Sequence, residues 1–200
     1  MEYDLLELQD AIRKVLMPKR YLHSLGVQYT CAALAMRYEC DIMKAQVAGI
    51  LHDVAKCYDN IEQIRRCEKY NIPISDVERE QSYLLHAKLG AYYAKSKYGV
   101  EEEEILQAIA FHTTGKPEMT KLEEIVFLSD YMEPSRRMIP GLTQIRKLAF
   151  EDLDLAVYTT LHNTLNYLKS NGQIIDNTTN EAYEYYRGIV GNKKLERRNL

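Results

Sequence analysis

The sequence predicts an all-α protein, a single-domain bundle of helices, and three observations support this prediction. Apolar residues recur at helical spacing in successive segments, beginning with Leu5, Leu8, Ile12 and Val15. Capping residues precede many of these segments, and glycine or proline follows several of them. The 200 residues contain no run of alternating strands, no internal repeat and no low-complexity linker. We therefore expect one domain over residues 1–190, followed by a solvated C-terminal tail over residues 191–200.

The first third of the chain predicts four helices. One covers residues 4–16, and Pro18 suits the first turn of a second, which runs to about residue 37. Asp41 is a plausible N-cap for the third helix. The apolar residues of that helix cover more than one stripe, so we expect it to be central and largely buried. Asn60 with Gln63 resembles a capping box that opens a shorter fourth helix.

Further helices are expected along the rest of the chain. Ser75 with Glu78, and Thr120 with Glu123, form two more capping boxes. Gly99 ends a helix that begins near His86. The acidic run 101–104 suits the first turn of the next helix, because carboxylates there interact favourably with the helix dipole. The remaining helices are predicted at residues 142–150, 152–170 and 180–189, with a loop at 173–178.

Composition and charge exclude several functional classes. The formal net charge is −3, which argues against a broad nucleic-acid-binding face but leaves room for a local basic pocket. No apolar run is long enough to span a bilayer, and the N-terminus lacks the features of a signal peptide. None of the four cysteines forms a C-x-x-C pair. We therefore expect a cytoplasmic protein with reduced thiols and no membrane partner.

An adjacent His52-Asp53 pair lies inside an otherwise apolar helical run. A buried, unpaired carboxylate is costly, so such a group is normally paired or bound to a metal. The chain offers suitable partners in His23, His86, His112 and Asp130. Histidine and carboxylate without thiolate form a ligand set for iron, manganese, zinc, nickel or cobalt.

The number of metal ions is left open by the residues. Asp53 can offer one oxygen to each of two ions, as a bridging ligand does. If only one ion binds, the natural ligands are the two aspartates with His23 and His52. His86 and His112 would then hold phosphate or donate a proton, because histidine titrates near neutral pH. Lys56 lies one turn after the pair and can reach a phosphate beside the metal.

The order and spacing of these residues resemble the H…HD…D signature of the HD-domain superfamily of metal-dependent phosphohydrolases. The wider sequence resembles the bacterial YqeK-type family of symmetrical diadenosine tetraphosphate hydrolases over about residues 10–185. The stretches that carry the resemblance include Arg20-Tyr21-Leu22-His23-Ser24, Gly49 to Lys56, His86 to Ala91, Ile109 to Gly115, and Leu128 to Arg136. His86 and His112 match the two extra histidines of family members that bind a second metal. Ser129 stands where alanine is usual.

The resemblance implies a helical bundle with the His-Asp pair on a central helix, iron as the metal, and a nucleotide substrate split into two nucleoside diphosphates. The polyphosphate needs cationic partners, for which Arg20, Lys56 and Arg136 are the candidates. Thr113 can add a donor. The resemblance also implies that the loop 173–178 closes over the nucleoside, with contacts from Ile174 (or Ile175), Asp176 and Thr178. The alternative for this loop is a simple helix connection packed on the core.

Two other functions stay open at this stage. Some HD proteins with the same six ligands form a di-iron site that activates oxygen on a small polar substrate. The surplus of cations around the ligands argues against that chemistry. A nucleotide-binding sensor with little turnover is the second alternative, and the intact ligand set argues against it. A homodimer also stays open.

Overall fold

The computed structural model describes residues 3–198, with side chains in the last helix as far as Lys193. Within that range the chain is helical and contains no strand, which confirms the all-α prediction. The helices are α1 (Leu5–Val15), α2 (Pro18–Tyr38), α3 (Ile42–Leu51), η1 (Val54–Cys57), α4 (Asn60–Lys69), α5 (Asp76–Glu80), η2 (Ser82–Leu84), α6 (Leu85–Tyr98), α7 (Glu103–Phe111), α8 (Lys121–Met132), α9 (Leu142–Glu151), α10 (Leu153–Ser170) and α11 (Asn177–Arg198).

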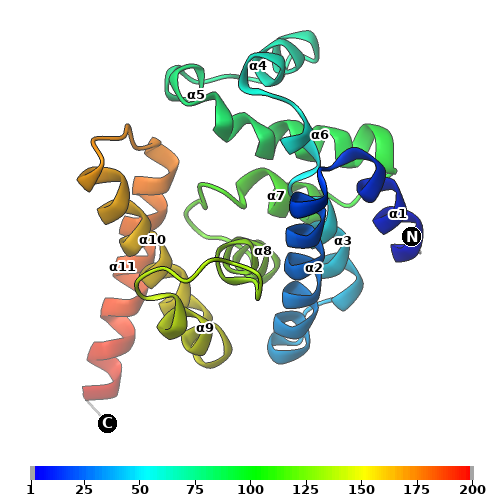
Figure 1. Ribbon diagram of the computed structural model, residues 1–200. Coiled ribbons are helices and arrows are strands. Elements are labelled where there is room, and N and C mark those ends of the chain that lie inside the picture. The colour runs from blue at the N-terminus through cyan, green and yellow to red at the C-terminus, as the bar shows by residue number, and fades with distance from the viewer. Residues whose placement is uncertain (1–2, 199–200) are drawn as a thin grey trace.

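Helix α8 lies in the middle of the bundle (Figure 1). It contacts α2 and α3 on one side, α10 on the other, and α7. Nine of its twelve residues are buried, including Ile125, Val126 and Leu128. This burial explains why α8 shows no single apolar stripe in the sequence. Helices α10 and α11 pack together as an outer pair at the left of Figure 1, and α4, α5 and α6 lie at the top of the molecule in this view.

Close packing of α3 against α2 depends on Gly49. A Cβ atom at this position would lie only 2.8 Å from the Cα atom of Gln28. A Cβ atom does not approach a non-bonded carbon atom so closely, so only glycine permits the two helices to lie this close together. The close approach brings the C-terminal end of α3 beside the first turns of α2.

The His-Asp pair does not lie inside a continuous helix, and this expectation was wrong. Helix α3 ends at Leu51, His52 is its C-cap, and η1 begins at Val54. Asp53 has φ −103° and ψ 15°, outside the α-helical conformation. Neighbouring residues of a regular helix point about 100° apart. The break removes this constraint and lets both side chains face one point.

Several predicted helix ends are confirmed, and the predicted start of α4 is wrong. Capping boxes form at Ser75 with Glu78 and at Thr120 with Glu123. Gly99 ends α6 with φ 67°, a conformation that glycine adopts readily. The N-cap of α4, however, is Asp59 instead of Asn60, because the Asp59 carboxylate accepts the backbone N–H of Glu62.

The last helix is longer than expected. It runs from Asn177 to Arg198, where a helix over residues 180–189 was expected, and the segment from residue 191 is helical as far as the structure describes it. Lys193 stabilises this extension through ion pairs with Asp152 (3.0 Å) and Asp154 (2.6 Å) at the start of α10. None of the described helices is both long and apolar enough to cross a membrane.

Candidate metal centre

Six side chains from five parts of the fold meet at one point beside α8. Their histidines and Asp53 are buried, and the side chain of Asp130 is 22% exposed. The set comprises His23 of α2, His52 and Asp53 at the α3–η1 break, His86 of α6, His112 after α7, and Asp130 of α8. These are the six residues that the sequence proposed as ligands.

Three of the histidines are held in the same way. Nδ1 of His52 donates to the carbonyl of Gly49, and Nδ1 of His112 donates to that of Ile109, each at 2.7 Å. His86 makes the corresponding bond to the carbonyl of Tyr83. A carbonyl can only accept, so Nδ1 carries the proton in each ring. Nε2 of each ring then carries a free lone pair that points into the cluster. This tautomer is the one that binds a metal.

The two carboxylate oxygens of Asp53 face different histidines. Oδ2 lies 3.5 Å from Nε2 of His52 and 3.7 Å from Nε2 of His23. Oδ1 lies 3.3 Å from Nε2 of His86 and 3.7 Å from Nε2 of His112. Asp53 therefore stands between two pairs of histidines, with one oxygen toward each pair.

Asp130 joins the first of these pairs. Its Oδ1 is 3.0 Å from Nε2 of His23 and 3.8 Å from Nε2 of His52. Ligand atoms of these three residues lie within 4.8 Å of one another, and so do those of His52, Asp53 and His112. Both groups have the size and composition of a site for a transition metal ion.

The donor set fits a bound cation. Nε2 of His52 is buried without a hydrogen-bond partner. Nε2 of His86 and Nε2 of His112 face each other at 3.0 Å, although both rings carry their proton on Nδ1. Thr113 lies 3.2 and 3.1 Å from these two atoms, but its hydroxyl has one proton and can donate to only one of them. Metal ions held on the two sides of Asp53 would satisfy these lone pairs.

The electrostatics of the cluster keep its carboxylates ionised. Burial alone would raise the pKa of Asp53, but His52, His112 and His86 around it hold that pKa well below its usual range. Burial likewise opposes the lowered pKa of Asp130, which results from His23 and the neighbouring histidines. Ionised carboxylates are the form that binds a metal.

Three cations surround the cluster. Nη1 of Arg20 donates to Oδ2 of Asp53 at 2.6 Å. Nη2 of Arg136 lies 3.8 Å from Oδ1 of Asp130. Burial lowers the pKa of Lys56, with Asp53 opposing this change and Arg20 adding to it. The cations expected from the sequence are thus next to the cluster, with Arg20 in direct contact with a proposed ligand.

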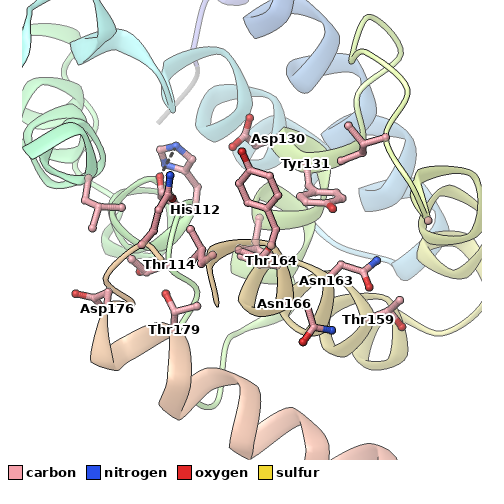
Figure 2. Close-up of a pocket in the computed structure, with 18 of the residues that line it drawn as sticks. His112, Thr114, Asp130, Tyr131, Thr159, Asn163, Thr164, Asn166, Asp176 and Thr179 are labelled. Carbon is pink, nitrogen blue, oxygen red and sulfur yellow. Dashed lines mark hydrogen bonds between the residues drawn. The ribbon is translucent and has the colours of Figure 1, made fainter. Parts of the chain in front are cut away.

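A cavity of about 820 Å³ opens beside the cluster (Figure 2). His112 and Asp130 lie at one side of it. Thr113 and Arg136 also line it. Its far wall comes from α10 and from the chain that leads into α11. Figure 2 shows Asn163, Asn166 and Asp176 among the residues of this wall. A cavity of this size is typical of a small-molecule site.

The loop before α11 contributes to this cavity, although not as expected at every residue. Ile174 and Asp176 line it. Thr178 is absent from the described lining residues, and its neighbour Thr179 is present. The reason is that α11 begins at Asn177, so Thr178 is already helical and its N–H donates to Oδ1 of Asp176. Asp176 thus also caps the helix.

Comparison with known proteins identifies the architecture. The family model for the HD domain matches residues 20–135. This chain belongs to the HD domain family. It is 41% identical over 172 residues to the symmetrical bis(5'-nucleosyl)-tetraphosphatase of Halalkalibacterium halodurans, covering 86% of this chain and 91% of that protein. The protein of the same name from Bacillus subtilis is 38% identical over 176 residues, covering 87% and 92% of the two chains.

A solved structure supports the same assignment. It is a protein from Clostridium acetobutylicum, described as a predicted HD superfamily hydrolase involved in NAD metabolism. It superposes on this HD domain protein with a TM-score of 0.89 at 37% identity, over 94% of this chain and 99% of that one. The predicted family membership is thereby confirmed along most of the chain.

Some residues of the site were not assigned a role from the sequence of this HD domain protein. Glu133 is 1% exposed and accepts a hydrogen bond from Nδ1 of His23 at 3.1 Å. Tyr131, Gln144 and Asn163 line the cavity. Glu133 belongs to the motif around Asp130, and this proximity was the one available signal for it. The cavity residues of α9 and α10 carry no motif.

Proposed function

We propose that this protein is a metal-dependent hydrolase that splits diadenosine tetraphosphate and related dinucleoside tetraphosphates symmetrically into two nucleoside diphosphates. The observation that supports this most is Asp53, with one oxygen toward each of two histidine pairs, in a cluster whose His112 and Asp130 line a large cavity. The names of relatives that match this chain over most of its length support the same substrate class.

Iron is the proposed metal, as one or two ions, with manganese, zinc, nickel or cobalt as substitutes. His23, His52 and Asp130 would hold one ion with Oδ2 of Asp53. His86 and His112 would hold a second with Oδ1 of the same residue. A bound ion of this kind lowers the pKa of a water ligand and neutralises charge on phosphate oxygens.

The chain supplies the remaining parts of the site. Arg136 stands between Asp130 and the cavity, where a guanidinium can bind a phosphate oxygen. Lys56 and Arg20 add positive charge near Asp53. The hydroxyl of Thr113, close to His86 and His112, can donate to a phosphate. His86 and His112 serve as phosphate ligands or proton donors if only one ion binds.

The nucleoside is proposed to lie in the cavity. Ile174 offers an apolar surface for the base, and the free oxygen of Asp176 can accept from an exocyclic amine. Thr178 contributes indirectly, because its N–H holds Asp176. The HD domain with this cavity would occupy residues 1–190.

The test is purification without oxygen, metal analysis, and identification of the products formed from diadenosine tetraphosphate. We expect bound transition metal and ADP as the product. ATP with AMP would indicate asymmetric cleavage and contradict the proposal. Consumption of oxygen by the reduced enzyme would favour the oxygenase, and tight nucleotide binding without turnover after metal reconstitution would favour the sensor.

A further inference from the structure

Glu133 is a buried carboxylate that the proposed reaction does not use. It follows α8, three residues after Asp130, and is 1% exposed. Its Oε1 accepts from Nδ1 of His23 at 3.1 Å and from the hydroxyl of Ser135 at 2.7 Å. Its Oε2 accepts from the backbone N–H of Ser135 at 2.6 Å. Both oxygens therefore have partners within the protein, and these hydrogen bonds hold the buried carboxylate in place.

The backbone around Glu133 is fixed as well. Arg146 of α9 donates from Nη2 to the carbonyl of Glu133 at 2.8 Å and from Nε to that of Met132 at 2.9 Å. Pro134 follows directly and restricts the backbone further. The backbone that carries the Glu133 carboxylate is therefore restrained, and this restraint helps to hold the carboxylate against His23.

Helix α2 provides the space for this carboxylate at Gly26, one turn after His23. A Cβ atom at Gly26 would overlap Oε2 of Glu133 and lie 3.2 Å from its Cδ. Glycine inside a helix is less favourable than alanine, because it loses more backbone freedom on folding. Here the missing side chain is what allows a carboxylate to reach the ring of His23.

His23 differs in this respect from the other three histidines of the cluster. Those rings donate to backbone carbonyls three residues earlier in their own helical segments. His23 instead donates to a charged group from another part of the chain. A carboxylate on the remote nitrogen orients a histidine and makes its free nitrogen a stronger metal ligand than a carbonyl does.

We propose that Glu133 is a positioning residue for the metal centre, which directs Nε2 of His23 toward Asp53 and Asp130, and that Gly26 is required to admit it. This inference rests on the proposed metal centre but not on the proposed substrate. Loss of Glu133 should weaken the ion held on the Oδ2 side of Asp53 and leave the ligands on the Oδ1 side in place.

The test is metal binding by the metal-free protein, titrated with Co²⁺ and followed by the visible absorption of the bound ion. Glu133→Ala should lower the affinity for one ion by about 10- to 100-fold and change its absorption spectrum. Glu133→Gln retains an oxygen that can accept from His23, so it should give an intermediate affinity and a folded protein. Gly26→Ala should resemble Glu133→Ala, and it should have little further effect in the Glu133→Ala background.

Glu124→Gln is the matched control, because Glu124 is a buried carboxylate of α8 that bonds to Tyr186 of α11 and to no member of the metal cluster. It should leave the Co²⁺ affinity and spectrum unchanged. Equal affinities and spectra for wild type and Glu133→Ala would overturn the inference while leaving the metal centre intact. Failure of the wild type to bind Co²⁺ would overturn both.

Discussion

The His52-Asp53 pair determines, in our proposal, whether a metal is retained. His52→Ala removes a fully buried ligand, and Asp53→Ala removes the carboxylate that faces both histidine pairs. Each change should abolish metal retention and lower hydrolysis by more than about a hundredfold, since a metal contributes several kcal/mol to such a reaction. Metal analysis and steady-state assays measure these effects, and circular dichroism should show the helical fold preserved.

The fifth histidine provides the control for this experiment. His162 lies on α10, stacks with Tyr158 and Tyr183, and takes no part in the metal cluster. His162→Ala should keep both metal and activity. Full activity in either variant of the pair would contradict the metal assignment.

Arg136 should bind substrate rather than metal. It lies between Asp130 and the cavity, so a phosphate group there would accept a charge-assisted hydrogen bond. Such bonds contribute about 1.5–3 kcal/mol, so Arg136→Ala should raise KM by about 10- to 100-fold while metal content is unchanged. Arg137→Ala, at the exposed neighbouring position, is the matched control and should leave KM unaltered. An unchanged KM for Arg136→Ala would remove its phosphate role.

Residue identity was enough to predict the six members of the cluster but not how they are held. Histidine is scarce in this chain, and four of its five histidines recur near helix ends or in apolar helices, which identifies them as candidate ligands. No such signal in the sequence identifies Glu133 as the partner of His23. Glu133 meets it only because α2 and the end of α8 pack together around Gly26, and packing of this kind depends on tertiary structure.

At the level of helices, the separation of α2 and α3 depends on Gly49. Gly49→Ala would bring a Cβ atom to within 2.8 Å of the Gln28 backbone, which has no means of moving aside cheaply. Overpacking of this kind costs about 1–3 kcal/mol. Urea denaturation should therefore show a lower free energy of unfolding, and Tm should fall by about 2–4 °C for each kcal/mol.

Gly188 of α11 offers the matched comparison for Gly49. A Cβ atom there would meet nothing within 4 Å. Gly188→Ala should stabilise the protein by about 0.5–1 kcal/mol, because alanine is the better helix former. Equal effects of the two substitutions would show that helix propensity, and not the contact between α2 and α3, determines the result.

Helices α8, α10 and α11 meet at a buried acidic group with a testable pH dependence. Burial and the nearby Asp154 raise the pKa of Glu124 from 4.5 to about 8, although the Tyr186 hydroxyl and Lys193 oppose the change. Between about pH 4.5 and 8 the folded state then keeps a proton that the unfolded state loses. Stability should therefore fall as pH rises through this window, by a few kcal/mol in total.

Glu124→Gln should remove most of that pH dependence, because glutamine does not ionise. Urea denaturation at pH 5, 6.5 and 8 measures the slope for both proteins. Glu181→Gln, on the exposed face of α11, should retain the slope of the wild type. A Glu124→Gln variant with the same slope as the wild type would show that this carboxylate is ionised in the folded state.

The helices were largely predictable because their caps and apolar spacing are local signals. The break between α3 and η1 was not, since the apolar pattern continues through Asp53 and gives no sign of it. The break lets the side chains of His52 and Asp53 face one point. Its position therefore reflects the geometry of the cluster more than the local helix propensity of the sequence. The extension of α11 was missed for a similar reason, because the pairing of Lys193 with the start of α10 is a tertiary contact.

For the molecule as a whole, the proposed metal links parts of the chain that are far apart in sequence. Its ligands come from α2, the α3–η1 break, α6, the end of α7, and α8. An ion bound by the folded state alone adds about 4 kcal/mol of stability when its concentration is about 1,000 times Kd. Removing it with a chelator should therefore lower Tm by about 8–16 °C, in one cooperative transition.

His52→Ala separates this effect from other actions of the chelator. The variant lacks a ligand to the proposed ion, so its Tm should already be low and should not respond to chelation. Scanning calorimetry of both proteins, with and without chelator, measures the difference. If the chelator lowered Tm equally in both, the stabilising ion would lie elsewhere, whereas a shift confined to the wild type would show that a metal at the cluster around Asp53 stabilises the bundle.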